Sequence, residues 1–359
     1  MPRRAAFLLA FALLGGCATP PAPPAPAPAP LPPWPAMERV DVHEGVGPET
    51  TVLGRLQRVA VGPEDTFPDI ARRFDVGYDE LVAANPGVDP WIPGEGTLVL
   101  VPTAHVIPDA PRRGIVVNVA AMRLWWFGAP DEAGRQVVLT HPIGIGRVGW
   151  ATPVGETKVV SKAQDPTWYP PASVRREHAE EGDPLPAVVP PGPDNPLGRH
   201  AVRLALPGYL IHGTNKPWGV GMRVSHGCIR LYPEDIETLF GRIVPGMPVA
   251  LVDQPWLVGE QDGELVFEAH AVLEEAVADW TRGLEQLGER AGEAAVDWSK
   301  AAAVVREARG IPMPVGAAGP EEDAWFARAP VVENRSRGNY REAVVAEEAP
   351  GGAGAGAAP

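Results

Sequence analysis

The chain has 359 residues, a formal net charge of −14 and 45% hydrophobic residues. This length allows about two domains with connecting segments, and the acidic balance makes a nucleic acid an unsuitable partner for the chain as a whole. The 44 prolines and 40 glycines indicate that much of the chain is loop, linker or tail.

Residues 1–17 have the pattern of an export signal. Two arginines precede an apolar run that ends in Gly15-Gly16-Cys17, and this order is typical of secretory signals. The run is too short for a helix that spans a bilayer, which needs about 20 residues. Leu14 to Cys17 resembles the lipobox of bacterial lipoproteins. This resemblance implies that the signal is cleaved before Cys17, which then becomes the N-terminal residue and carries lipid. The alternative is an ordinary signal peptide that happens to contain a cysteine.

If Cys17 carries lipid, Cys228 is the only thiol of the mature protein, since the chain has two cysteines. An exported lone thiol then needs a function other than an intramolecular disulfide. The residue after the lipobox, Ala18, implies by resemblance an outer-membrane rather than an inner-membrane anchor. Residues 18–56 follow as a stalk and linker, because Ala18 to Pro35 are almost all proline and alanine and cannot bury a core.

Residues 57–102 are predicted to be a small module with the order strand, helix, helix, strand. The strands are expected at 58–61 and 97–102, and the second helix at 78–84. This order, with Gly62-Pro63-Glu64-Asp65-Thr66 and Asn85-Pro86, resembles the LysM module, which binds N-acetylglucosamine-containing glycans such as peptidoglycan. Phe67-Pro68 departs from that pattern. The alternative is a spacer that binds no glycan.

Residues 103–253 are predicted to be a mainly β domain with some helix. Its expected elements are strands at 115–119, 123–127, 137–140, 158–160, 209–212 and 249–252, and a helix at 233–240. Residues 162–193, rich in proline and charge, are expected to form a lid over the site. Residues 254–316 are predicted to be a partly helical C-terminal extension, with a strand at 264–267 and helices at 269–287 and 294–309. Residues 317–359 are predicted to be a disordered tail.

The chemistry is concentrated in His212-Gly213-Thr214 and in the later stretch Ser225 to Arg230, which contains His226, Gly227 and Cys228. A thiol becomes a strong nucleophile when a neighbouring base or cation keeps it as a thiolate, and a histidine supplies such a base. The glycine before the cysteine permits a sharp approach and frees backbone N–H groups for an oxyanion. Arg230 can pair with a substrate carboxylate.

A catalytic cysteine has two alternatives, a buried structural residue and a metal ligand. A lone cysteine is often a small core residue, but core cysteines are not surrounded by serine, histidine, glycine and arginine. A zinc site from His212, His226 and Cys228 lacks an obvious fourth ligand, because His200 is possible but unconvincing. The sequence therefore predicts neither a metal nor an organic cofactor.

The two motifs together resemble the signature of the L,D-transpeptidase catalytic domain, the YkuD family: a His-Gly pair, a spacer, and Ser/Thr-His-Gly-Cys-x-Arg/Asn. Gly144 to Gly146, Thr152 to Gly155 and Asp194 to Gly198 extend the likeness. The resemblance implies an L,D-transpeptidase-type β-sandwich. It also implies that Cys228 attacks the diaminopimelate–D-Ala bond of a tetrapeptide stem and that an amine resolves the thioester.

By the same resemblance His212 is the base, and the Gly213 carbonyl holds its tautomer. The other roles that it implies are oxyanion donation by the N–H groups of Gly227 and Cys228, hydrogen bonding by Ser225, loop shaping by His226, and binding of an anionic substrate by Arg230 and Arg223.

The domain pairing looks closest to enterobacterial enzymes that attach the major outer-membrane lipoprotein to peptidoglycan. This likeness implies a periplasmic, lipid-anchored enzyme of a Gram-negative outer membrane. Its partners would be peptidoglycan stems and glycan, with an outer-membrane lipoprotein as a further acceptor. Three functions stay open at this point: a transpeptidase, an L,D-carboxypeptidase on the same scaffold, and a wall-binding lipoprotein.

Overall fold

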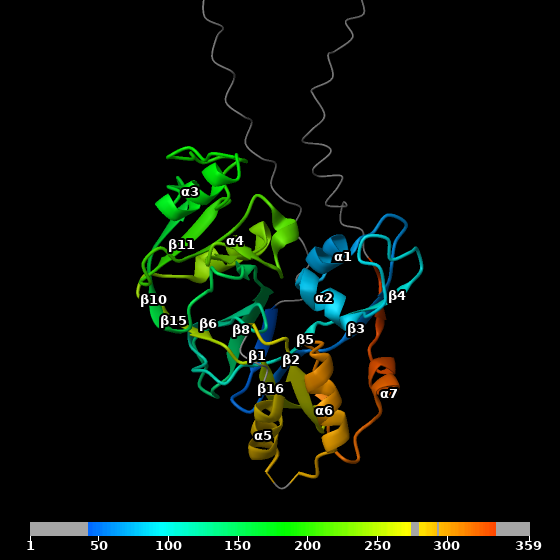
Figure 1. Cartoon of the computed structure of the whole chain (residues 1–359). Coiled ribbons are helices and arrows are strands. Elements are labelled where there is room, and N and C mark those ends of the chain that lie inside the picture. The colour runs from blue at the N-terminus through cyan, green and yellow to red at the C-terminus, as the bar shows by residue number, and fades with distance from the viewer. Residues whose placement is uncertain (1–41, 274–279, 293, 335–359) are drawn as a thin grey trace, which may run out of the picture. The chain divides into compact units, whose positions relative to one another are not determined.

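The computed structural model describes residues 42–273, 280–292 and 294–334, and it is mainly β with several helices, as predicted (Figure 1). The predicted signal with Cys17, most of the predicted stalk and residues 335–359 of the predicted tail lie outside the described residues. Within the described ranges, none of the helices combines the length and the apolar character that crossing a bilayer requires.

The largest sheet has nine strands in the order β1-β8-β7-β6-β15-β10-β11-β12-β14. The predicted strands of the central domain are all present in it. The bounds are β1 Val42–Val46, β6 Gly114–Asn118, β7 Arg123–Phe127, β8 Gln136–Pro142, β10 Gly155–Gln164, β11 His200–Leu204, β12 Leu210–His212, β14 Ile229–Arg230 and β15 Pro248–Val252.

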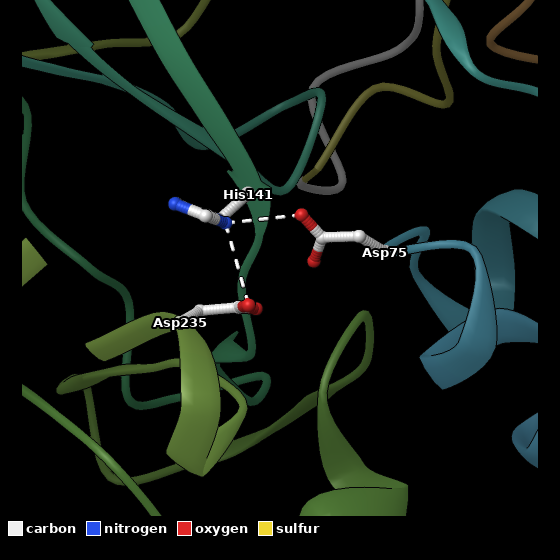
Figure 2. Close-up of side chains that lie close together, drawn as sticks. All are labelled: Asp75, His141 and Asp235. Carbon is white, nitrogen blue, oxygen red and sulfur yellow. Dashed lines mark hydrogen bonds and ion pairs between the residues drawn. The ribbon is translucent and has the colours of Figure 1, made fainter. Parts of the chain in front are cut away.

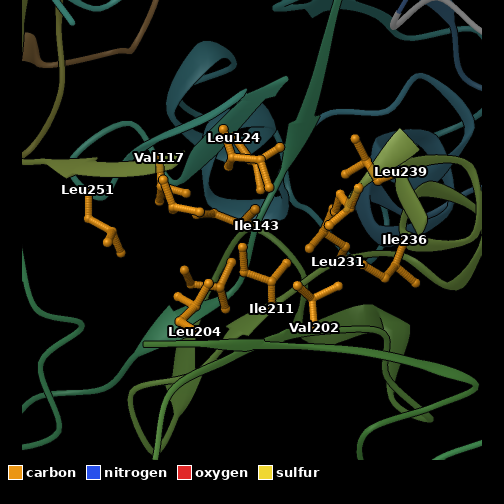
Figure 3. Packing of buried hydrophobic residues seen from close by; sticks show 14 of the residues in the cluster. Val117, Leu124, Ile143, Val202, Leu204, Ile211, Leu231, Ile236, Leu239 and Leu251 are labelled. Atoms are coloured by element: carbon orange, nitrogen blue, oxygen red, sulfur yellow. The ribbon is translucent and has the colours of Figure 1, made fainter. Parts of the chain in front are cut away.

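Strand β10 joins the two halves of this sheet. It pairs with β15 through its first residues and with β11 through its last, and the register shifts between Val159 and Ser161. Side chains from both halves share one apolar core (Figure 3), for example Leu124 on one side and Val202 and Ile211 on the other. The predicted sandwich is thus one continuous sheet whose halves enclose a common core. Helix α4 (Pro233–Arg242) adds Ile236 and Leu239 to it.

The segment from residue 57 to 101 has the predicted element order. It contains β3 Gln57–Ala60, α1 Phe67–Arg73, α2 Tyr78–Ala84 and β4 Leu98–Val101. Thr66 caps α1, and its backbone N–H donates to Asp69 at 2.9 Å. The unusual Phe67 is fully buried in the apolar core of this segment, so its role here is packing, while Pro68 is tolerated in the first turn of a helix.

Two predicted boundaries are wrong. The predicted linker contains β1, which pairs with β8, and β2 (Val52–Gly54), which pairs with β5 (Ala104–Val106). The predicted disordered tail contains α7 (Glu322–Ala327) and β19 (Val331–Val332), and β19 pairs with β3. Few apolar residues mark these stretches, and several of them, such as Val46, Leu53 and Trp325, are buried against distant partners. Composition alone could not reveal such long-range packing.

The region after residue 254 mixes a small sheet with helices. β16 (Trp256–Gln261), β17 (Glu264–Ala269) and β18 (Met313–Pro314) form three strands, and β17 covers the predicted strand. The helices are α5 (Trp280–Ala291) and α6 (Trp298–Glu307). The first of them was predicted to begin at Ala269, but that residue closes β17, where it pairs with Trp256.

Charged groups are buried where the segment 57–101 meets the central domain. Arg123 of β7 has 2% of its side chain exposed and donates to Glu80 of α2 at 3.0 Å and to the Asp75 carbonyl at 3.2 Å. Arg72 of α1 holds Glu234 of α4 with two bonds of 2.8 and 2.9 Å. A buried charge without a partner is strongly unfavourable, so each of these ions stabilises the fold only while its partner is present.

A cluster of polar side chains at the same boundary joins β8, the loop between α1 and α2, and α4 (Figure 2). His141 of β8 is fully buried, and its Nδ1 lies 3.0 Å from Asp75 Oδ2 and 3.5 Å from Asp235 Oδ1. Asp75 lies between α1 and α2, whereas Asp235 belongs to α4. Burial alone would raise the pKa of Asp75, but the charge and hydrogen bond of His141 outweigh it, so the pKa is lowered.

Replacing Arg123 with methionine should lower the free energy of unfolding by about 3 to 5 kcal/mol, because Glu80 is then left as an uncompensated buried charge. Urea denaturation measures this loss. The matched control is Arg135→Met in the exposed pair with Asp131, at 3.2 Å, which should change stability by less than about 1 kcal/mol. Equal losses in the two variants would contradict the assignment of the Arg123 pair as buried and structural.

Asp75→Asn should lower the free energy of unfolding by about 1.5 to 3 kcal/mol at pH 7, the range for hydrogen bonds to charged groups. A carboxylate whose folded pKa is depressed stabilises above its unfolded pKa, and this contribution is lost as the pH falls through the folded value. The difference from wild type should therefore shrink below the ordinary value of 3.8. The exposed Asp323→Asn is the control, and a difference that persists unchanged at low pH would contradict the ion pair.

Candidate active site

The pairing of β12 with β14 brings the two sequence motifs together. The strands run parallel, with Ile211 opposite Ile229 and His212 opposite Arg230. Both isoleucines are buried in the main core, at 0 and 1% exposure, so the register cannot slip without exposing them. Cys228 immediately precedes β14, so the same register places it opposite Leu210, two residues before His212 on the neighbouring strand.

His212 is held in one tautomer. Its ring is buried, and Nδ1 lies 2.6 Å from the carbonyl oxygen of Gly213, the contact that the sequence predicted. A carbonyl only accepts, so Nδ1 carries the proton and Nε2 has its lone pair available. Burial, aided by the charge of Arg230 and opposed by the Gly213 bond, lowers the pKa of His212 to about 3. The imidazole is therefore neutral at pH 7.

Cys228 is also neutral in the resting site. Burial raises the pKa of the thiol, although a hydrogen bond from Leu210 and the charge of Arg230 act in the opposite direction. Its Sγ lies 3.7 Å from the Gly208 carbonyl oxygen. The expected standing thiolate is thus replaced by a neutral thiol, and His212 and Cys228 form a pair of neutral groups.

The loop before Cys228 is fixed by its own hydrogen bonds. Ser225 Oγ donates to the Cys228 carbonyl at 2.6 Å and accepts the N–H of Gly227 at 3.1 Å. Thr152 Oγ1 donates to the Gly227 carbonyl at 3.0 Å and accepts the N–H of Gly146 at 3.1 Å. Gly227 has a φ of +100°, which favours glycine. The prediction that Gly227 N–H is free for an oxyanion is wrong for this state, because Ser225 occupies it.

The predicted lid segment reaches the same loop. Its helix α3 (Ala172–Glu180) carries Glu177, whose Oε2 lies 2.7 Å from Nε2 of His226. Glu177 also forms an ion pair with Arg147. The ring of Trp150 meets His226 edge-on, with centroids 4.8 Å apart. Sequence reasoning missed Glu177 and Arg147, because only tertiary structure brings them to the motif.

The two arginines predicted to bind substrate lie on neighbouring short strands. Arg230 belongs to β14, and Arg223 belongs to β13 (Arg223–Ser225), which pairs with β9 (Ile145–Gly146). Both are half-buried, and the Nε atom of each is buried without a hydrogen-bond partner among the described residues. Each guanidinium therefore keeps at least one N–H that no protein acceptor uses.

The contacts of His226 do not favour the zinc alternative, because its Nε2 faces Glu177. In the described ranges, the group of side chains whose ligand atoms lie close enough to hold a metal is Asp75, His141 and Asp235, which does not include Cys228.

Alkylation of Cys228 should report its raised pKa. The rate of reaction with iodoacetamide is expected to rise with pH up to and beyond 9.0, the ordinary value for a thiol, because the thiolate is the reactive form. Peptide mapping by mass spectrometry separates this site from Cys17, and glutathione serves as the reference thiol. A rate that levels off below pH 7 would indicate a preformed thiolate–imidazolium pair and would contradict the neutral pair.

Comparison with known proteins agrees with this geometry. The model of the L,D-transpeptidase catalytic domain, YkuD, matches residues 112–251. The probable L,D-transpeptidase YcfS of Escherichia coli strain K12 is 46% identical over 215 residues, which are 58% of this chain and 66% of that protein. ErfK/SrfK of Salmonella typhimurium is 43% identical over 62% of this chain and 72% of its own length. YbiS of Escherichia coli strain K12 is 38% identical over 76% of this chain and 83% of its own length. Both are named as probable L,D-transpeptidases, and the chain belongs to this family of enzymes.

Proposed function

We propose that this chain is a cysteine L,D-transpeptidase of the bacterial cell wall that acts on the diaminopimelate–D-Ala bond of tetrapeptide stems. The observation that carries the proposal is the pairing of β12 with β14, which brings Cys228 and a neutral His212 with an available Nε2 onto adjacent strands. A nucleophile beside an oriented base is the arrangement that acyl transfer through a covalent intermediate requires.

The proposed reaction has two halves, and His212 carries the proton in both. Cys228 Sγ attacks the carbonyl carbon of the third stem residue, and its proton passes to Nε2 of His212. The bond to the terminal D-alanine then breaks, and His212 returns the proton to the leaving amine. In the second half an acceptor amine attacks the thioester and gives a proton to His212. The new amide forms, and Cys228 regains its proton as it leaves.

The charges that develop need protein partners. Cys228 N–H is the proposed oxyanion donor, and Gly227 N–H could join it only after its bond to Ser225 breaks. Arg230 and Arg223 are proposed to bind carboxylates of the stem, supported by their unused Nε groups. His226 is proposed to shape the loop, in keeping with its contacts to Trp150 and Glu177.

The cellular setting is part of the proposal. The signal pattern that ends at Cys17 favours a lipid-anchored protein of the periplasm, attached to the outer membrane of a Gram-negative bacterium. Residues 57–102 are proposed to be a LysM module for peptidoglycan glycan. Their element order supports this, as do Trp91 and Ile92, which are 59 and 80% exposed. The acceptor amine is either another stem, which gives a 3–3 crosslink, or a lysine of an outer-membrane lipoprotein.

Incubation of the full chain with a tetrapeptide-stem muropeptide should give a transient mass increase at Cys228 and, by chromatography, 3–3 dimers. Cys228→Ala should give neither. His212→Ala should slow acylation by a factor of about 10² to 10⁴, the usual contribution of a general base. Intact-protein mass spectrometry follows the adduct.

The other outcomes separate the alternatives. Released D-alanine with tripeptide as the only product would indicate an L,D-carboxypeptidase. No adduct and no product, together with sedimentation of the protein with purified peptidoglycan, would indicate a wall-binding lipoprotein. Acylation of Cys228→Ala would contradict the assignment of the nucleophile.

A further inference from the structure

We propose that Arg147 binds a carboxylate of the acidic stem peptide, and that Glu177 of helix α3 occupies Arg147 while the site is empty. This inference rests on the proposed function, because it requires a donor substrate that carries carboxylates. It assigns a substrate-binding residue and a built-in competitor, neither of which lies in the sequence signature.

Arg147 is anchored to the loop of the nucleophile. Its backbone N–H donates to the Ser225 carbonyl at 3.0 Å, and its carbonyl accepts the N–H of Trp150 at 2.9 Å. Its Nη2 lies 3.3 Å from Nε2 of His226, two residues before Cys228. The guanidinium therefore lies close to the loop that leads to Cys228. The backbone of Arg147 is held in place by its hydrogen bond to Ser225 of β13.

Glu177 places a carboxylate on this guanidinium. One of its oxygens pairs with Arg147 and the other with His226. Hydrogen bonds from Arg147 first, and then from His226, lower the pKa of Glu177, so it is ionised at neutral pH. Arginine binds carboxylates through paired N–H groups. A stem that ends in diaminopimelate and D-alanine carries such carboxylates. Glu177 thus occupies the place of a substrate carboxylate.

Helix α3 is weakly held, as a displaceable element must be. Val174 is the one buried residue among its nine, and most of the others are exposed. The side chains of Arg147 and Glu177 are 37 and 26% exposed, and ion pairs at such sites contribute little net stability. A substrate carboxylate that also gains contacts elsewhere in the site can therefore displace Glu177 from Arg147.

Binding can be measured without turnover in the full chain with Cys228→Ala. Isothermal calorimetry with a tetrapeptide-stem muropeptide should show that adding Glu177→Gln tightens binding about two- to fivefold, as expected for removal of an exposed competing ion pair. Adding Arg147→Gln should weaken binding roughly tenfold or more, as expected for loss of a charged hydrogen bond. Arg147→Lys, which keeps the charge but loses the fork, should lie between.

The decisive comparison is the double variant. Glu177→Gln should give no tightening of substrate binding in the Arg147→Gln background, because there is then no arginine for which Glu177 and the substrate carboxylate compete. Glu180→Gln is the matched control: the residue is exposed on the same helix, the charge change is identical, and affinity should not change. A stem whose diaminopimelate and D-alanine carboxylates are both amidated should lose the effect of Glu177→Gln.

Weaker or unchanged binding in the Glu177→Gln variant would overturn the proposal and leave Glu177 as a structural support of His226. Tightening that persists without Arg147, or that Glu180→Gln reproduces, would overturn it as well, because a general charge effect would then be responsible. Failure of the proposed function is visible separately, as a wild-type enzyme that binds the stem but forms no adduct at Cys228.

Discussion

The site depends on the register of one short parallel strand pair. Ile211 and Ile229 face each other in the main core, and their burial fixes β12 against β14. Once this register is set, His212 and Cys228 lie on adjacent strands, although sixteen positions separate them in the sequence. Hydrophobic packing, with no polar contact to the site, thus brings the two motifs together. A polar substitution at either isoleucine would disturb the chemistry through the strand pair.

The same desolvation acts on both members of the pair, and in each case it favours the neutral form. It lowers the pKa of the imidazole and raises that of the thiol. A neutral thiol reacts slowly with oxidants and other electrophiles, since the thiolate is the reactive species. In the proposed mechanism the proton acceptor at the moment of attack is the Nε2 of His212 that the Gly213 contact leaves available. That mechanism combines low resting reactivity with a prepared base.

Sequence reasoning reached the parts of the site that a local motif encodes. His212, Cys228 and the Gly213 contact were predictable because a few adjacent residues define them, and the strands of the central domain were predictable from apolar runs. The charged contacts were not, because Glu177 and Arg147 are thirty positions apart and come together only through tertiary packing. The lid was predicted from its length and composition, but neither indicates which of its several acids reaches the loop. Short elements such as β1 and β19 escaped because their few apolar residues gain stability only from distant partners.

The segment 57–101 is attached to the loop of the nucleophile more closely than a tethered binding module needs to be. Gly221, shortly before that loop, has a φ of +79°, and a Cβ there would lie 2.2 Å from the Cα of Gly77. After the loop, Tyr232 donates to the Val76 carbonyl at 3.3 Å, and Glu234 holds Arg72. Residues 72–77 thus contact the chain both before and after Cys228. A flexible tether would need none of these contacts, so the segment is part of the framework that holds the chain on both sides of Cys228.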